Sequence, residues 1–223
     1  DVVVFCAAIT KFEDCRKDLK QAYVVNVSGP ARLASYYAKA GAKIIQLSTN
    51  AVFDGKTPFV SASTAPNARN GYGGLKAEAE AEFIKINGNV AILRLTKIII
   101  PGNNIFFNWL SELQQGQEIR AFKDQYFSPV TIDLAIRAIL AVIDDDDNGF
   151  YQFSAKGDIS YFEAARRMAQ MYGISEELIV ETSASENGIP ENEVFRYNSL
   201  DSTRIERLNI IPPDPFAILN NLV

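Results

Sequence analysis

Three side chains in the first third of the sequence have the types and spacing needed for acid–base chemistry at a carbonyl group. Tyr72 and Lys76 lie at i and i+4, so a helix would present the phenol and the ammonium on one face. An ordinary phenol has a pKa of about 10, and a neighbouring cation lowers that pKa by favouring the phenolate. Thr49 follows an apolar run, and its hydroxyl could hold a carbonyl oxygen beside the phenol. Tyr–Lys pairs also arise by chance on solvent-facing helices, and a threonine after a strand often caps a turn, so only the combination points to a site.

The elements expected around these residues form a parallel α/β sheet. The Val-rich run Val2–Ala8 predicts a strand buried on both faces, Lys43–Leu47 predicts a second strand, and Asn89–Ile100 contains a third. Helical patterns separate the strands, over Arg16–Ala40 and Gly71–Ile86. Strand–helix alternation at this spacing favours a right-handed parallel sheet. Such sheets bind ligands beyond the carboxyl ends of their strands, which is where Thr49 is expected.

Local signals refine the two helical patterns. Pro30 should kink or split the first, and Gly41 fits its C-terminal cap. In the second, Leu75, Ala79 and Phe83 form the expected buried stripe.

After Pro101 the pattern becomes mixed. We expect a strand at Glu118–Phe122, a charged turn at Asp144–Asp147, a strand at Phe150–Phe153, and helices at Asn104–Gln114, Thr131–Ile143, Ser160–Tyr172 (with a capping box from Ser160 and Glu163) and Ser202–Leu208. The predicted division is a sheet domain over residues 1–148 and a small α+β region over residues 149–223, to which residues 101–128 also contribute.

Composition narrows the function classes. The 223 residues carry a net charge of −5 and no Lys/Arg cluster, which argues against nucleic-acid and membrane partners. The sequence has no histidine, so His-based catalytic triads and His metal ligands are excluded, and no metal site is predicted. No apolar run approaches the roughly 20 residues that span a bilayer. The two cysteines are expected to be free thiols in a reducing, cytoplasmic compartment.

Motifs along essentially the whole chain resemble the extended short-chain dehydrogenases/reductases, and within them the dTDP-4-dehydrorhamnose reductase group. Residues 1–8 are similar to that family's fourth strand, and residues 22–30 to the helix that follows it. Leu47 to Gly55 resembles the group's S-T-D-Y-V-F-D-G segment, and Asn70 to Glu78 partly matches N-x-Y-G-x-x-K-x-x-x-E. Further similarities lie at Arg94-Leu95-Thr96, Asp124-Gln125 with Ser128-Pro129, and Arg196 with Ser199-Leu200-Asp201.

The resemblance implies a Rossmann-like fold that binds NAD or NADP and reduces a keto group of a nucleotide-linked sugar. By position, Tyr72 would donate the proton, Lys76 would bind the nicotinamide ribose and lower the pKa of Tyr72, and Thr49 would hold the reacting carbonyl. The implied cofactor-binding residues are Cys6, Ala7, Ala8, Ser48, Tyr72, Lys76, Thr96 and Ile98. The implied substrate-binding residues are Thr49, Asn50, Lys97, Asn104, Gln125 and Arg196.

Departures from the group leave other functions open. Asn50 and Ala51 replace the usual Asp-Tyr after Thr49, which disfavours a sugar-nucleotide dehydratase, because that reaction needs a carboxylate pair there. An epimerase of the same family remains an alternative. So does a non-catalytic or regulatory member, since the regulatory subunit of methionine adenosyltransferase resembles the same group.

The start of the sequence bears on how the cofactor binds. Asp1 opens directly into the Val2–Ala8 run, so we expect the sequence to begin inside the fold, without the family's first strands and Gly-rich pyrophosphate turn. This chain alone is therefore expected to bind the cofactor poorly. Its bare first strand is expected to be covered, by a homodimer or another partner.

Overall fold

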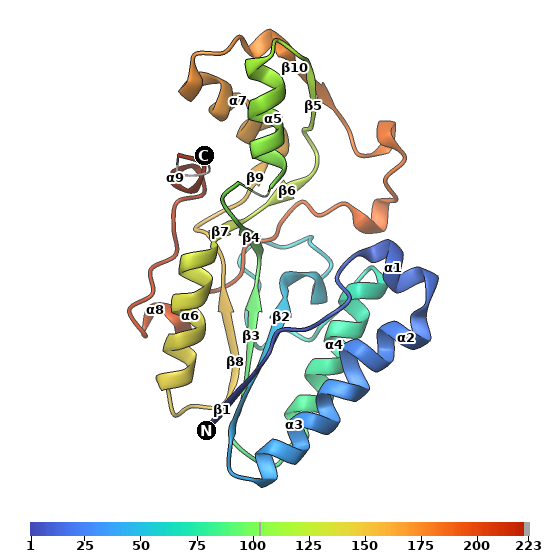
Figure 1. Ribbon diagram of the computed structural model, residues 1–223, viewed down its shortest axis with the longest axis vertical. Helices are drawn as coiled ribbons and strands as arrows, with labels where there is room; N and C mark the ends of the chain where they lie inside the picture. Colours follow the sequence, from blue (N-terminus) through green and yellow to red (C-terminus); the bar gives the residue numbers. More distant parts are fainter. Residues whose placement is uncertain (103, 221–223) are drawn as a thin grey trace.

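The computed structural model describes residues 1–102 and 104–220, and its centre is a four-stranded parallel sheet in the order β1-β2-β3-β8 (Figure 1). The strands span Val2–Phe5 (β1), Lys43–Thr49 (β2), Val90–Leu95 (β3) and Gly149–Phe153 (β8). In register, Val2 faces Lys43, Ile44 faces Val90, and Ala91 faces Gly149. Because every pair is parallel, all four carboxyl ends lie at one edge of the sheet, and the predicted α/β class is confirmed.

One face of the sheet is covered by α3 (Gly29–Lys39) and α4 (Gly71–Ile84), as Figure 1 shows. The predicted stripe of α4 is confirmed, since Leu75, Ala79 and Phe83 are all buried. Phe83 packs with Ile44 and Ile92 of the two central strands. These contacts fix the rotation of α4, and so they decide which of its residues face the edge of the sheet.

The opposite face is covered by α6 (Ile132–Asp144), whose buried side chains Ala135, Ala138 and Val142 pack against Ile45 and Leu93. Thr131 caps this helix by accepting a hydrogen bond from the backbone N–H of Leu134 at 3.2 Å. With α3 and α4 on one face and α6 on the other, the sheet is doubly wound, as predicted.

The helical pattern expected over Arg16–Ala40 is divided into four pieces: α1 (Phe12–Lys17), α2 (Leu19–Tyr23), a π-helical turn η1 (Val24–Ser28) and α3. Pro30 lies in the first turn of α3, where its missing N–H costs nothing. The helix does not split at Pro30, because η1 runs directly into α3; the wider π turn just before the proline is the local distortion that accompanies it.

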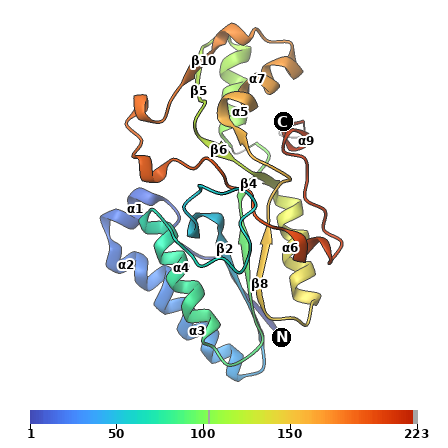
Figure 2. The ribbon, with the colours of Figure 1, turned by 180° about the vertical axis from the view of Figure 1, so that it is seen from behind.

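A second group of elements lies above the carboxyl edge of the sheet (Figures 1 and 2). Helices α5 (Ile105–Gln114) and α7 (Tyr161–Tyr172) pack on a parallel pair of strands, β5 (Ile119–Phe122) and β10 (Ile179–Thr182). Their core includes the rings of Phe106, Trp109 and Phe127. The capping box predicted at Ser160 is confirmed, with both of its hydrogen bonds formed.

The remaining elements are short. These are η2 (Asn50–Val52), β4 (Lys97–Ile99), β6 (Tyr126–Phe127), β7 (Pro129–Thr131), β9 (Ile159–Ser160), η3 (Glu176–Leu178), η4 (Ser185–Asn187), η5 (Glu191–Glu193), α8 (Thr203–Glu206) and α9 (Pro215–Leu219). Strand β4 pairs with β7, and β6 pairs with β9, so the chain crosses between the sheet and the upper group along several short ladders.

The first strand differs from its prediction in length and burial. Strand β1 ends at Phe5 rather than Ala8, and the Val2 side chain is 41% exposed. The reason is that β1 is the outer strand of the four, with β2 as its hydrogen-bonded neighbour, so its chain leaves the sheet early. Cys6 and Ala7 consequently lie exposed just beyond the strand end, and both cysteines are free thiols, as predicted.

A buried ion pair ties α4 to the sheet directly below the carboxyl edge. Glu80 accepts hydrogen bonds from Arg94 Nε at 3.0 Å and Arg94 Nη2 at 2.8 Å, and both residues are at most 2% exposed. The hydroxyl of Ser48 donates to the same carboxylate at 2.5 Å. Breaking one partner of such a pair costs about 3–5 kcal/mol, so this cluster holds the helix of Tyr72 and Lys76 firmly on β2 and β3.

The turn predicted at Asp144–Asp147 follows the end of α6. There the Tyr151 hydroxyl donates to the carboxylate of Asp145 at 2.7 Å.

Among the residues that the structure describes, none of the helices has both the length and the apolar character needed to span a membrane.

Candidate active site

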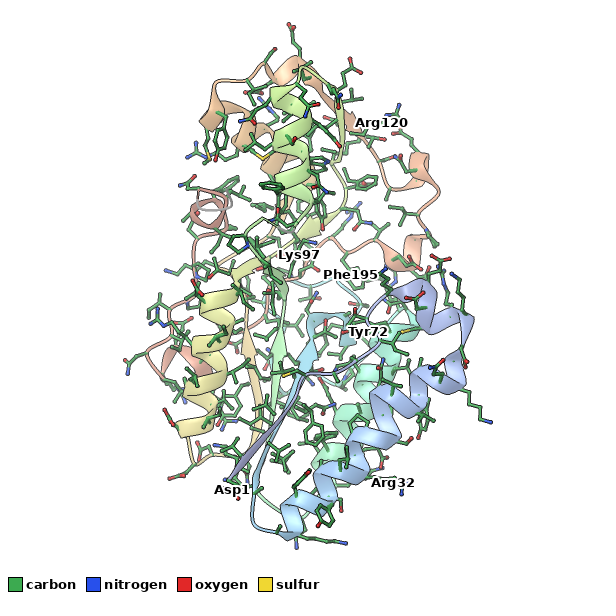
Figure 3. The ribbon with its side chains drawn as sticks, viewed as in Figure 1. Asp1, Arg32, Tyr72, Lys97, Arg120 and Phe195 are labelled. Atoms are coloured by element: carbon green, nitrogen blue, oxygen red, sulfur yellow. The ribbon has the colours of Figure 1, made fainter. Side chains whose placement is uncertain are left out.

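A cavity of about 900 Å³ lies at the carboxyl edge of the sheet, beneath the upper group of helices. Figure 3 shows Tyr72, Lys97 and Phe195 around the junction of the two groups. Most of the sequence-predicted site residues line this cavity: Cys6, Ala8, Ser48, Thr49, Asn50, Tyr72, Lys76, Thr96, Lys97, Ile98 and Gln125. The fold therefore brings side chains from three strand ends, one helix and the upper group into a single space.

Tyr72 lies in the first turn of α4, which Asn70 caps by accepting from the backbone N–H of Gly73 at 2.8 Å. Burial raises the pKa of Tyr72 to about 12, and the nearby Cys15 thiol adds to the rise. From the sequence we predicted a lowered pKa, because the Lys76 cation favours the phenolate. That prediction was wrong because it left out the cost of removing a phenolate from water. The chain's own groups thus keep Tyr72 protonated at neutral pH, in the form that can donate a proton.

Lys76 is 6% exposed, one helical turn beyond Tyr72. Its ammonium donates to the backbone carbonyl of Leu47 at 2.5 Å, which ties the lysine to the end of β2. Burial lowers the pKa of Lys76 to about 8, although the Glu80 carboxylate and the Cys6 thiol act in the opposite direction. Lys76 is therefore a desolvated cation that remains mostly charged at neutral pH.

Thr49 ends β2 and begins η2, and it has the capping role that the sequence left open. Its hydroxyl oxygen accepts from the backbone N–H of Ala51 at 3.1 Å, and the hydroxyl donates to Asn50 Oδ1 at 3.4 Å. The second bond is long, so the hydroxyl hydrogen can turn towards another acceptor in the cavity. Thr49 can therefore both cap the turn and donate to a bound carbonyl.

The close approach of α4 to η2 depends on a glycine. A Cβ atom at Gly73 would lie 2.0 Å from the backbone oxygen of Ala51, whereas one at Gly74 would meet nothing within 4 Å. We expect Gly73→Ala to push α4 away from η2 and to lower the free energy of unfolding by about 1–3 kcal/mol or more.

The neighbouring glycine supplies the matched control. Gly74→Ala should raise stability by roughly 0.5–1 kcal/mol, because alanine is the better helix former. Urea denaturation of both variants measures the difference. Equal stability of the two would contradict the packing described.

Three predicted site residues lie outside the cavity. Ala7 is exposed beyond β1. Asn104 caps α5, accepting from the backbone N–H of Phe107 at 3.0 Å. Arg196 is exposed in an adjoining hollow of about 670 Å³, which it lines with Phe59 and Tyr197, and Tyr126 lines both spaces.

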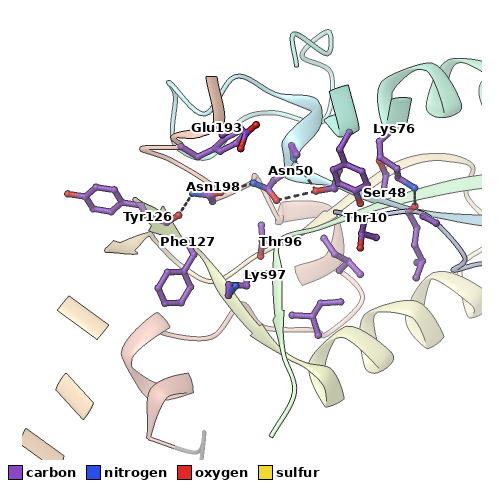
Figure 4. Close-up of a pocket in the computed structure, with 18 of the residues that line it drawn as sticks. Thr10, Ser48, Asn50, Lys76, Thr96, Lys97, Tyr126, Phe127, Glu193 and Asn198 are labelled. Atoms are coloured by element: carbon purple, nitrogen blue, oxygen red, sulfur yellow. Dashed lines mark hydrogen bonds between the residues drawn. The ribbon is translucent and has the colours of Figure 1, made fainter. Parts of the chain in front are cut away.

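Several lining residues were not identified from the sequence: Thr10, Tyr126, Phe127, Tyr161, Ile189, Glu193, Phe195 and Asn198. Most come from loops or very short elements without periodicity. One signal was available for Asn198, because it lies between Arg196 and Ser199 in a segment already associated with the substrate region. Figure 4 shows that Asn198 is hydrogen-bonded on both sides within the cavity.

The family model described as "RmlD substrate binding domain" matches residues 1–218. The chain is 30% identical over 217 residues to the spore coat polysaccharide biosynthesis protein SpsK of Bacillus subtilis (strain 168), covering 95% of this chain and 75% of that protein. It is 28% identical over 194 residues to the dTDP-4-dehydrorhamnose reductase of Mycobacterium tuberculosis (strain CDC 1551 / Oshkosh), covering 83% of this chain and 64% of the reductase.

Among solved structures, the chain is similar to the dTDP-4-dehydrorhamnose reductase of Bacillus anthracis (strain Ames) in complex with NADP. The TM-score is 0.88 at 24% identity, and the match covers 99% of this chain and 79% of that chain. At this identity the likeness establishes the shared fold.

Proposed function

The chain belongs to the family described as the RmlD substrate binding domain, and from that premise we propose that it carries the active site of an NAD(P)H-dependent reductase acting on a keto group of a nucleotide-linked sugar. The proposal rests on one observation: the side chains of Thr49, Tyr72 and Lys76 line the same cavity. A hydroxyl, a protonated phenol and a buried ammonium together can hold a carbonyl and protonate its oxygen as a hydride arrives at the carbon.

Each of the three residues has one part in the proposed reaction. Thr49 donates its hydroxyl hydrogen to the carbonyl oxygen and keeps that oxygen facing the phenol. Tyr72 transfers its proton to the same oxygen as negative charge develops there. Lys76 stabilises the resulting phenolate and donates to a ribose hydroxyl with N–H groups other than the one bound to Leu47.

The residues at the edge of the sheet fit the nicotinamide end of NAD or NADP. Small side chains after β1, among them Cys6 and Ala8, leave the backbone accessible beside Lys76. Thr96 can offer its hydroxyl oxygen only as an acceptor, because the hydroxyl hydrogen is donated to the carbonyl of Ser128 at 2.5 Å. When bound, the reduced nicotinamide supplies the hydride.

The substrate side of the cavity comes from the upper group and the segments that join it to the sheet. The Lys97 ammonium lies 5.6 Å from the centre of the Tyr161 ring, which holds this cation at the cavity wall. We propose that Lys97 and Gln125 contact the sugar nucleotide, and that Arg196 in the adjoining hollow binds its distal part. In this arrangement residues 1–148 form the cofactor-binding domain, residues 149–223 form most of the substrate region, and residues 101–128 contribute to it.

An epimerase of the same family would use the same three residues and is the second candidate. The absence of carboxylates at Asn50 and Ala51 weighs against a dehydratase, and the presence of Thr49, Tyr72 and Lys76 on one cavity weighs against a non-catalytic member. A reductase consumes reduced cofactor with each turnover, whereas an epimerase consumes none. The cofactor balance therefore separates the two candidates.

The proposal extends to the setting of the protein. We propose a cytoplasmic reaction, supported by the two free cysteines. We also propose that the open edge of β1 is covered by a second copy of the chain or by another partner, because an open strand edge invites pairing.

The test of the proposed function is an assay of the full-length protein with dTDP-4-dehydrorhamnose and NADH or NADPH. We expect one reduced nicotinamide to be consumed for each sugar nucleotide reduced, followed by absorbance and by chromatography of the product. Conversion of the sugar without loss of reduced cofactor would support the epimerase instead.

A further inference from the structure

A chain of amide hydrogen bonds connects Thr49 to the far side of the cavity, and Figure 4 labels its further members Asn50, Asn198 and Tyr126. The hydroxyl of Thr49 donates to Asn50 Oδ1 at 3.4 Å. The other end of the Asn50 amide, Nδ2, donates to Asn198 Oδ1 at 2.8 Å. The Asn198 amide in turn donates from Nδ2 to the backbone carbonyl of Tyr126 at 2.8 Å.

The position of Asn198 is itself fixed by Asp158. The carboxylate of Asp158 accepts from the backbone N–H groups of Asn198 at 2.6 Å and of Ser199 at 3.0 Å, and from the Ser199 hydroxyl at 2.6 Å. Ser199 is 1% exposed, so this anchor is buried. A carboxylate with three donors holds its loop tightly, and the Asn198 side chain therefore projects into the cavity from a rigid base.

The direction of these bonds determines how Asn50 faces Thr49. An amide offers an acceptor on one side and two donors on the other. Because Asn198 presents its oxygen, it accepts from Asn50 Nδ2, and the oxygen of Asn50 must turn towards Thr49. If the Asn50 amide flipped, its NH₂ group would face the Thr49 oxygen, which already accepts from the backbone N–H of Ala51, and the hydroxyl hydrogen would lose its resting acceptor.

We infer that Asn198 is a positioning residue for Thr49: acting through Asn50, it keeps an acceptor beside the Thr49 hydroxyl, which holds that hydroxyl in place until its single hydrogen turns to the substrate carbonyl. This inference rests on the proposed function, because it assumes that Thr49 holds the reacting carbonyl. It adds a residue from the C-terminal part of the chain, 148 positions from Asn50, to the machinery at the end of β2.

The segment that carries Asn198 offers a matched control. Asn192 also donates a side-chain amide hydrogen bond across to the sheet group, to the backbone carbonyl of Arg69 at 3.1 Å, but it does not line the cavity. Asn192→Ala removes one bond from the same segment without touching the Asn50–Asn198 pair. It separates general loosening of the segment from loss of the orientation of Thr49.

The test is a double-mutant cycle on the full-length protein, with kcat and KM measured for NADPH-dependent reduction of dTDP-4-dehydrorhamnose. We expect Asn198→Ala to lower kcat and kcat/KM together by roughly 10- to 100-fold, because the Thr49 hydroxyl is then no longer pre-positioned for the carbonyl oxygen when the transition state forms. In an Asn50→Ala background the same change should cost less than about 3-fold. Asn192→Ala should retain wild-type kcat, and all variants should melt within about 5 °C of the wild type.

Two results would overturn the inference and leave the proposed function intact, provided that the wild type is active and that Tyr72→Phe removes its activity. The first is an Asn198→Ala enzyme with the kcat of Asn192→Ala. The second is a full additional loss from Asn198→Ala when Asn50 is already alanine. A wild type that does not reduce the sugar nucleotide would instead overturn the proposed function, and the inference with it.

Discussion

Replacing Lys76 by methionine should stabilise the protein at pH 7 by about 1–3 kcal/mol while removing most of its activity. The pKa of Lys76 is lowered from 10.5 to about 8, chiefly by burial. That difference means that burying the charge costs about 3 kcal/mol of folding free energy at neutral pH. The variant avoids this cost, but it also loses the hydrogen bond to Leu47, which offsets part of the gain in stability. Methionine fills a similar volume and carries no charge. The buried lysine thus lowers the free energy of unfolding while supplying the charge that the proposed reaction needs.

The pH dependence gives the sharper version of this prediction. Between pH 8 and pH 10.5 the unfolded chain binds more protons at Lys76 than the folded chain does, so the wild type gains stability from this group as pH rises. The advantage of Lys76→Met should therefore be full below pH 8 and nearly absent above pH 10.5. Urea denaturation of both proteins at pH 7 and pH 10 measures it.

Lys85→Met is the control for this experiment. The Lys85 side chain is 68% exposed and forms an ion pair with Glu82 at the end of the same helix. Its replacement should change the free energy of unfolding by less than about 0.5 kcal/mol at either pH. A Lys76→Met protein that is less stable than the wild type at pH 7 would show that the buried ammonium is stabilising after all.

Tyr72→Phe should lower kcat by about 10²–10⁴-fold and change KM little, because it removes the proposed proton donor and leaves the ring in place. The phenol remains protonated at neutral pH, since burial raises the pKa of Tyr72 to about 12. Steady-state kinetics with NADPH and dTDP-4-dehydrorhamnose provide the measurement.

Tyr37→Phe serves as the comparison, since Tyr37 lies on α3 and is 40% exposed. It should behave as the wild type in the same assay. Comparable rates for Tyr72→Phe and Tyr37→Phe would remove Tyr72 from the reaction.

The sequence predicted the part of the site that rests on regular elements. Leu75, Ala79 and Phe83 set the buried stripe of α4, and this stripe fixes where Tyr72 and Lys76 point. Strand β2 was recognisable from its apolar residues, so Thr49 could be placed at a strand end. In these elements the local pattern and the tertiary packing agree, which is why periodicity was sufficient.

The rest of the site depends on contacts that periodicity does not encode. Asn198 lies in a segment without regular structure, and its partner Asn50 is 148 positions away. Glu193 reaches the cavity from a 3₁₀ turn, held by an ion pair with Arg16 at 3.0 Å. The pKa of Tyr72 was predicted in the wrong direction because its sign depends on how deeply the ring is buried, and burial follows from packing.

The most direct test of the central claim is to follow the hydride itself. Full-length protein incubated with dTDP-4-dehydrorhamnose and NADPH deuterated at the transferring position should yield a sugar nucleotide with one deuterium, bonded to the carbon of the former keto group. Mass spectrometry and NMR of the product locate that deuterium. A converted sugar nucleotide without deuterium at that carbon, or a substrate left unchanged by the wild type, would contradict the assignment of this chain as a nicotinamide-dependent reductase.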